Sequence, residues 1–251
     1  MKRTSRIVKI LGVFIAVLAF SKNVYASENV FYTTPNGIEL TEEEYTFLTN
    51  FYWEGYPDIM TQAQYEEFTN SDLLTRKLKV KKLEVPTSSA ETSTRSSSHS
   101  TDSKSIQIGS ACNNSNCVTS IVATWFGSPS VRSFDVIGAY LSGVSLISHN
   151  LTYVYSTSGT TNFYNLKTAS NGIGNSVKLP DTGEDIVINM IFTTTKGGYI
   201  YGSYQHAMYN TTLPVSQYYN FSLGGYGNVF DFYSYADNDL YDEMPGVDIS
   251  V

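Results

Sequence analysis

Hydrophobic and polar residues alternate along most of the chain beyond residue 118. Between residues 186 and 193, one set of alternate positions carries Ile186, Ile188, Met190 and Phe192, and the other carries Val187, Asn189, Ile191 and Thr193. Because successive side chains of a strand point to opposite faces, a period of two predicts β-structure. Comparable runs cover 118–126, 131–141, 144–148, 151–156, 175–179, 199–206, 218–223, 226–235 and 247–251. The spacing of these runs predicts a mainly β domain over residues 106–251, built as an antiparallel β-sandwich.

Two glycine pairs interrupt this pattern. Gly197-Gly198 precedes the run that begins at Tyr199, and Gly224-Gly225 separates the runs 218–223 and 226–235. Glycine accepts the positive φ of tight turns, so each pair predicts a β-hairpin.

Residues 27–75 follow a different pattern, in which Leu40-Thr41-Glu42-Glu43-Glu44-Tyr45 recurs as Met60-Thr61-Gln62-Ala63-Gln64-Tyr65. Each copy places Thr at an N-cap and Glu or Gln three residues later, and an apolar residue before the cap pairs with Tyr at N4. These are capping boxes with hydrophobic staples, and they predict a short α-helical hairpin whose helices begin at Glu42 and Gln62. The first helix is expected to bury Tyr45, Leu48 and Tyr52 and to end near Gly55.

Between the helices and the sandwich, residues 76–105 predict a linker that is first basic and then rich in Ser and Thr. Residues 76–86 alternate charge with Leu and Val, which is typical of an edge strand or of a solvated extension. From Thr87 to Ser105, 13 of 19 residues are Ser or Thr. Burial of so few apolar side chains cannot offset the conformational entropy that ordering would cost. This stretch is therefore expected to be disordered, and the modules on either side of it need not touch. A glycosylated or protease-accessible stalk would have the same composition.

The first 26 residues have the composition of a secretory signal peptide. Basic residues precede an apolar run of eleven residues, Ile10 to Phe20, and Val24 and Ala26 supply a cleavage site before Ser27. The run is shorter than the roughly 20 residues of a membrane span, although an uncleaved anchor is the alternative. We therefore expect a secreted, extracellular protein.

The charge balance restricts the partners. The formal net charge of −7 argues against nucleic acid, which attracts Lys- and Arg-rich surfaces. Removal of residues 1–26 would lower the net charge to −12, and such a protein is not expected to adsorb to anionic lipid or to insert stably in a membrane. Glu42, Glu43, Glu66 and Glu67 are expected to form a solvated acidic face.

Cys112 and Cys117 are the only cysteines. They flank an Asn/Ser turn, and an exported protein meets an oxidising environment, so we expect a disulfide. A catalytic thiol or a two-ligand metal site would need His or Cys partners, which are not near in sequence.

The sequence contains no Gly-x-Ser-x-Gly elbow, His-Glu-x-x-His pair, phosphate loop or dinucleotide fingerprint. His149 and His206 are expected to be satisfied turn or strand residues. Carboxylates are numerous after residue 130, but a glycosidase pair is defined by the separation of two acids in space. No catalytic residue is predicted, and a non-enzymatic protein is favoured.

Two candidate ligand sites remain. Asp237, Asp239 and Asp242 lie in the stretch richest in oxygen ligands and are candidates for Ca²⁺, the one cofactor considered, although ordinary turns have the same composition. Nine tyrosines lie between residues 199 and 235, and alternation places Tyr199 and Tyr201 on one face and Tyr204 on the other. Flat aromatic rows with hydroxyl groups suit sugar or protein surfaces, whereas cross-strand packing is the structural alternative.

The segments Asn36 to Leu48, Met60 to Tyr65 and Val131 to Leu141 resemble a group of uncharacterised secreted proteins of Gram-positive bacteria. The resemblance implies a bacterial protein with a signal peptide, a short helical pair, a polar linker and a β-rich C-terminal region in that order. It implies no catalytic residue and no ligand.

Export, the sandwich pattern and the missing catalytic motifs favour a non-enzymatic protein whose β-sandwich binds a cell-surface or host component, either glycan or protein. One alternative is a secreted hydrolase that uses carboxylates of the sandwich. A second is a β pore-forming protein, in which Ser/Thr-rich segments such as Ser156 to Thr161 would rearrange into amphipathic strands. The sequence does not indicate an oligomeric state.

Overall fold

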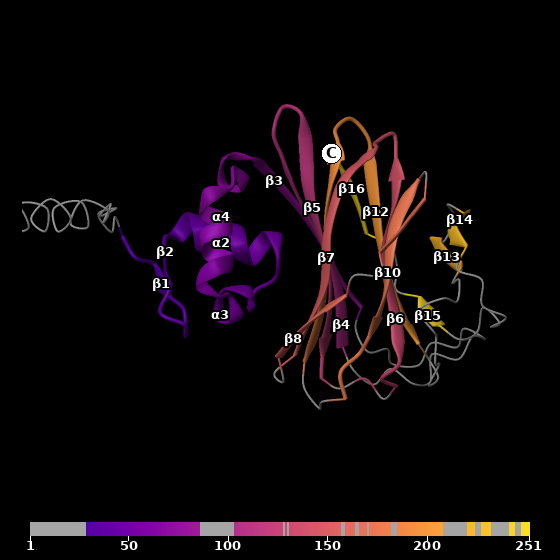
Figure 1. The fold of residues 1–251 in the computed structure, drawn as a ribbon, viewed down its shortest axis with the longest axis horizontal. Helices are drawn as coiled ribbons and strands as arrows, with labels where there is room; N and C mark the ends of the chain where they lie inside the picture. Colours follow the sequence, from indigo (N-terminus) through magenta and orange to yellow (C-terminus); the bar gives the residue numbers. More distant parts are fainter. Residues whose placement is uncertain are drawn as a thin grey trace, which may run out of the picture.

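The structure is a computed structural model that describes residues 29–85, 103–127, 129, 131–156, 159–163, 166–169, 171–181, 185–207, 220–223, 227–231, 241–243 and 247–251. The expected signal peptide and most of the Ser/Thr-rich segment lie outside the described residues. The chain forms three layers, with a layer of helices on one side of two stacked sheets (Figure 1).

The sheet next to the helices, called here the helix-covered sheet, has the strand order β3-β4-β5-β11-β7-β8. Its strands are β3 (Lys77–Val85), β4 (Ser103–Cys112), β5 (Asn116–Phe126), β7 (Leu146–Ser156), β8 (Gly159–Phe163) and β11 (Ile186–Thr195). All of its strand pairs are antiparallel.

The second sheet has the order β15-β12-β6-β10-β9, and β16 also pairs with β12. Its strands are β6 (Phe134–Ser142), β9 (Leu166–Ala169), β10 (Gly172–Lys178), β12 (Tyr199–Ala207), β15 (Tyr241–Glu243) and β16 (Val247–Ser250). Its pairs are antiparallel too, so the predicted mainly β, antiparallel sandwich is confirmed.

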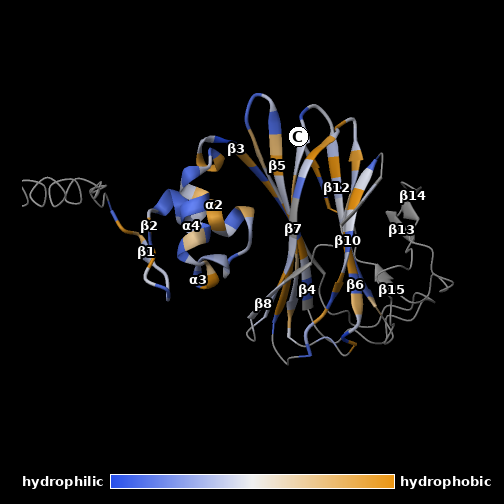
Figure 2. Cartoon of the chain, viewed as in Figure 1, coloured by the Kyte–Doolittle hydropathy of each residue, from blue (hydrophilic) through white to orange (hydrophobic). Residues whose placement is uncertain are grey.

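The main core lies between the two sheets, and β11 shows how the alternation creates it. Ile186, Ile188, Met190 and Phe192 are buried in this core, as the period of two predicts. The opposite face of β11 carries Val187, which packs with Tyr155 and Trp53 on the helix side. Hydrophobic residues run along the strands of both sheets, whereas much of the helical layer is hydrophilic (Figure 2). Both faces of the helix-covered sheet are therefore used for packing.

The prediction of a hairpin at Gly197-Gly198 is wrong. Strands β11 and β12 lie in different sheets, so this turn carries the chain from one sheet to the other. Gly197 has the expected positive φ of 99°. The turn is closed by the end of the chain, because the Gly197 N–H donates to Val251 O and the Val251 N–H donates to Gly198 O. At the second glycine pair, β13 (Asn220–Leu223) and β14 (Gly227–Asp231) form the antiparallel pair that was predicted.

The basic half of the predicted linker forms an edge strand. This was one of the two structures expected for it, the other being a solvated extension. Strand β3 pairs with β4 over nine residues, and β4 begins at Ser103, inside the Ser/Thr-rich segment. Lys79 Nζ donates to Ser250 O at 2.8 Å, and Lys81 forms an ion pair with Asp248. Alternate lysines of β3 thus reach β16 of the second sheet. The lysine side chains of this edge strand therefore contact the second sheet and do not extend freely into solvent.

The disulfide between Cys112 and Cys117 is confirmed. The two residues are cross-strand partners at the end of the β4–β5 hairpin, with their Cα atoms 4.1 Å apart. No free cysteine remains.

The helical layer contains α2 (Glu42–Phe51), α3 (Tyr56–Ile59), α4 (Gln62–Asn70) and a short 3₁₀ turn, η1 (Leu73–Thr75). A two-residue hairpin of β1 (Tyr32–Thr33) and β2 (Glu39–Leu40) precedes α2. Thr41 and Thr61 form the two capping boxes, and the helices begin at Glu42 and Gln62. Helix α2 ends at Phe51, earlier than expected, and Gly55 is the N-cap of α3.

The buried face of α2 also differs from the expectation. Phe47, Leu48 and Phe51 are buried, while Tyr45 and Tyr52 pack at the margin of the cluster. Placing the phenol rings at the margin keeps their hydroxyl groups within reach of polar partners.

The end of α2 lies in close contact with β4, which connects the helical layer to the sheet. A Cβ on Gly109 would lie 3.1 Å from Phe51 O, so a larger residue here would require the end of α2 to shift outward. Gln107 Nε2 donates to Asn50 O at 2.5 Å and to Tyr52 O at 3.1 Å. These bonds satisfy carbonyls at the C-terminal end of the helix.

Candidate functional site

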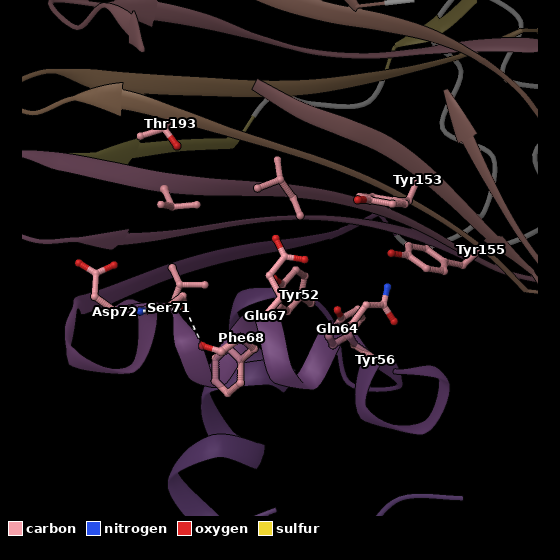
Figure 3. Close-up of a pocket in the computed structure, with 13 residues that line it drawn as sticks. Tyr52, Tyr56, Gln64, Glu67, Phe68, Ser71, Asp72, Tyr153, Tyr155 and Thr193 are labelled. Carbon is pink, nitrogen blue, oxygen red and sulfur yellow. Dashed lines mark hydrogen bonds between the residues drawn. The ribbon is translucent and has the colours of Figure 1, made fainter. Parts of the chain in front are cut away.

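A cavity of about 220 Å³ lies between the helical layer and the outer face of the helix-covered sheet (Figure 3). Its helix side is formed by the segment from α2 to η1, and its sheet side by β5, β7 and β11. The lining residues are Tyr52, Tyr56, Gln64, Glu67, Phe68, Ser71, Asp72, Leu73, Val118, Tyr153, Tyr155, Ile191 and Thr193. The cavity therefore joins residues from both layers of the fold.

Aromatic rings dominate the part of the cavity near α3. On the helix side, Tyr52 and Tyr56 stack with their ring centroids 4.0 Å apart. On the sheet side, Tyr153 and Tyr155 stack at 5.8 Å. Trp53 connects the two pairs, because its ring lies 4.9 Å from Tyr56 and 4.7 Å from Tyr155. Alternation along β7 turns both of its tyrosines toward the helices and Val154 into the main core.

Burial raises the pKa values of three phenols that line this cavity. Desolvation raises the pKa values of Tyr52, Tyr56 and Tyr155 well above the ordinary value of 10.0, and repulsion from neighbouring phenols adds to the effect. Glu67 contributes at Tyr52 and Tyr56. At physiological pH these side chains carry hydroxyl groups that can donate and accept hydrogen bonds.

Asp72, the second carboxylate of the lining, is already engaged. Its Oδ1 lies 2.8 Å from Arg76 Nε, and its Oδ2 accepts from Asn113 Nδ2 at 3.2 Å. The bond from Arg76 lowers the pKa of this carboxyl below its usual range. Arg76 also donates to Asn116 Oδ1 at 2.7 Å, so the pair ties η1 to the β4–β5 hairpin. Asp72 therefore supports the wall of the cavity, which leaves Glu67 as the carboxylate available to a ligand.

The three tyrosines predicted as candidate ligand-binding residues lie in different environments. Tyr199 is half exposed and Tyr201 is partly buried, and their rings stack at 6.3 Å on the second sheet. Tyr204 is fully buried in the main core, which excludes it from any surface site. The predicted alternation is thus correct, and within the described residues the tyrosine row consists of Tyr199, Tyr201 and the neighbouring Tyr140.

Of the residues proposed for Ca²⁺, only Asp242 can be placed. It lies in β15 opposite His206 of β12. Asp237 and Asp239 lie outside the described residues, so the calcium site stays a prediction. Within the described ranges, no group of three or more His, Cys, Asp or Glu residues could hold a metal ion.

His206 belongs to a buried polar network that was not predicted from the sequence. Its Nδ1 lies 2.9 Å from Asp135 Oδ2, and the same carboxylate accepts hydrogen bonds from the Tyr204 hydroxyl and from the Ala207 N–H. Trp125 Nε1 donates to the Tyr204 hydroxyl at 2.9 Å. Asp135 is fully buried. These contacts give the carboxylate and the imidazole a structural role in the core, while His149 is exposed on β7.

Comparisons with known proteins leave the function to be argued from the structure. No protein-family model matches the sequence, and no curated protein sequence matches it. Among solved structures, the chain is similar to the KRT10-binding region domain of the pneumococcal serine rich repeat protein PsrP, at a TM-score of 0.32 and 11% identity over 63% of this chain and 99% of that one. The enzymatically active domain of tailspike protein 4 of bacteriophage CBA120 is similar at a TM-score of 0.22 and 8% identity, over 46% of this chain and 16% of that one.

No helix in the described part of the chain is long and apolar enough to cross a membrane. The segment Ser156 to Thr161, considered for a pore, lies at the β7–β8 hairpin, where Ser156 pairs with Gly159 at the edge of the helix-covered sheet.

The cavity residues were missed because they are far apart in the sequence. Glu67 is exposed on α4, as expected for the acidic face, and only the fold brings it to the cavity. Tyr153 and Tyr155 lie in the predicted strand 151–156, and nothing in that strand's sequence indicates that helices cover it. The available signal was the local sequence Tyr52-Trp53 near the end of a helix, followed by Tyr56. So many aromatics at a helix end exceed what a short helix can bury by itself.

Proposed function

We propose that this protein is an exported, non-enzymatic binding protein, and that the cavity between its helices and its β-sandwich receives part of a cell-surface or host component. The observation that carries the proposal is the pair of tyrosine stacks that face the cavity from opposite layers, Tyr52–Tyr56 and Tyr153–Tyr155.

The chemistry of this cavity supports recognition. Aromatic rings with hydroxyl groups provide contact area together with hydrogen bonds, and they lose little conformational entropy on binding. Gln64 and Glu67 add polar groups at the helix side. A concave site lined by aromatics and a few polar side chains is the usual form of a ligand site.

The engagement of Asp135 argues against this residue as the catalytic acid of the hydrolase alternative. A general acid or nucleophile must reach its substrate, whereas this buried carboxylate is occupied by three protein partners.

The proposal is tested by measuring binding of the labelled full chain to a glycan array and to immobilised extracellular-matrix and surface proteins. The variant Tyr153→Ala removes one ring of the sheet-side stack. It is expected to weaken binding by about tenfold or more, because truncating a central aromatic residue typically costs about 2 kcal/mol.

Tyr199→Ala is the matched control, because it truncates an exposed tyrosine on the other sheet. Binding should survive this change. If Tyr199→Ala abolishes binding and Tyr153→Ala does not, the ligand site is the tyrosine row of the second sheet. If the full chain binds to neither array, the proposed binding function is rejected.

A further inference from the structure

The charges around the cavity select the kind of group that can enter it. The thirteen lining residues include two carboxylates and no Lys, Arg or His. Asp72 is neutralised by Arg76. Among the described residues, no salt bridge forms to Glu67, which lies on the exposed face of α4 and at the cavity. The negative charge of Glu67 would oppose an anionic ligand and would attract a cation.

The tyrosines reinforce this selection. Tyrosine phenols are protonated at neutral pH, and burial raises the pKa values of Tyr52, Tyr56 and Tyr155 further, so their rings contribute a π-surface and no charge of their own. The face of an aromatic ring is negative and attracts a cation placed within about 6 Å of its centre. Figure 3 shows Glu67 and Tyr52 on the helix side of the cavity, with Tyr153 and Tyr155 on the sheet side.

We infer that the cavity binds the cationic side chain of an arginine or lysine from a basic partner protein. The inference rests on the proposed binding function and names its partner. The charged end of the side chain would lie at Glu67, and its aliphatic stem would lie along the tyrosine rings, which is how such side chains pack on aromatic surfaces. A volume of about 220 Å³ is suited to one long side chain. The net charge of −7 would also accelerate the approach of a basic partner.

Isothermal titration of the full chain with short peptides tests this inference. The probe is a peptide with one central arginine, acetylated and amidated at its ends, and the matched probe carries citrulline, which has the same shape without the charge. We expect the arginine peptide to bind at least about tenfold more tightly than the citrulline peptide, and added salt to reduce the difference.

Two variants of neighbouring residues on α4 identify the responsible group. Glu67→Gln keeps the size of the side chain and is expected to lower the affinity for the arginine peptide by about tenfold. Glu66→Gln removes the same charge at a position outside the cavity lining, where Glu66 Oε1 accepts from Gln62 Nε2. It is expected to leave the affinity within about twofold, the remaining effect being long-range and screened.

The outcomes separate this inference from the proposed function. Equal binding of the arginine and citrulline peptides, no binding of either, or an equal response to Glu67→Gln and Glu66→Gln would overturn the inference. If Tyr153→Ala still abolishes binding to the arrays in that case, the cavity binds an uncharged ligand and the proposed function stands. If Tyr153→Ala has no effect on the arrays either, both fail.

Discussion

At the scale of single residues, the carboxylate of Asp135 organises one end of the main core. It accepts from the Tyr204 hydroxyl and from the Ala207 N–H at 2.9 Å, and it lies 2.9 Å from His206 Nδ1. A carboxylate that is removed from water is tolerated only where such donors replace the lost hydration. The same bonds connect the end of β12 to β6.

Asp135→Ala is therefore expected to lower the free energy of unfolding by about 3–5 kcal/mol, because several buried donors lose their acceptor at once. Urea denaturation followed by fluorescence measures the change, since Trp125 reports on this network. Asp248→Ala is the comparison, because it breaks an exposed ion pair with Lys81 and should cost about 1 kcal/mol or less. A cost for Asp135→Ala as small as that of Asp248→Ala would contradict the structural role of this carboxylate.

At the scale of elements, the two capping boxes are alike in the sequence but differ in their surroundings. Glu44 Oε2 accepts from the Thr41 N–H at 2.8 Å, and Gln64 Oε1 accepts from the Thr61 N–H at the same distance. Glu44 has a further partner, because its Oε1 accepts from the Tyr65 hydroxyl of α4 at 3.1 Å. Glu44 thus closes the start of α2 and also connects the two helices.

We expect Glu44→Ala to cost about 1–2 kcal/mol of unfolding free energy and Gln64→Ala only about 0.5–1 kcal/mol, because the second change removes a cap without an inter-helix bond. Thermal or urea unfolding of both variants provides the comparison. Tyr65→Phe is the control that removes only the bond between the helices. The explanation fails if Tyr65→Phe is neutral and the two capping variants are equally destabilised.

At the scale of the whole molecule, strand β3 connects the helical layer to the sandwich. Strand β3 precedes the Ser/Thr-rich segment in the chain, yet it pairs with β4 along its full length and reaches β16 through Lys79 and Lys81. The stretch that joins the helices to the rest of the sheet is therefore part of the sandwich itself.

A cut within residues 87–102 is expected to leave the two fragments bound to each other. Insertion of a specific protease site there, followed by size-exclusion chromatography, measures the result, and the uncut protein with the same insertion is the reference. Val80→Pro combined with Lys81→Pro should promote dissociation of the cut protein, because the N–H groups of adjacent strand residues point to opposite edges, so one of the two is removed from the pairing with β4. Release of a free, folded fragment that begins near Ser103 would show that the helices and β3 are dispensable for the sandwich.

The sequence by itself determined those features that depend on neighbours along the chain. The capping boxes at Thr41 and Thr61 close within three residues, and the disulfide spans a five-residue separation. The two faces of β11 follow from strand geometry alone, since alternation is a property of the extended backbone.

Only the tertiary structure decided which strands pair and which side chains meet. The turn at Gly197 is as tight as the sequence indicated, but the path of the next strand depends on burying a face of each sheet, so β12 joins β6 and not β11. Asp135 and His206 are separated by 71 residues, and the cavity brings Tyr52 from a helix end to Tyr153 from a strand. Such contacts form when elements with separate local signals bury their remaining apolar surfaces against each other, and this choice is made by the whole chain.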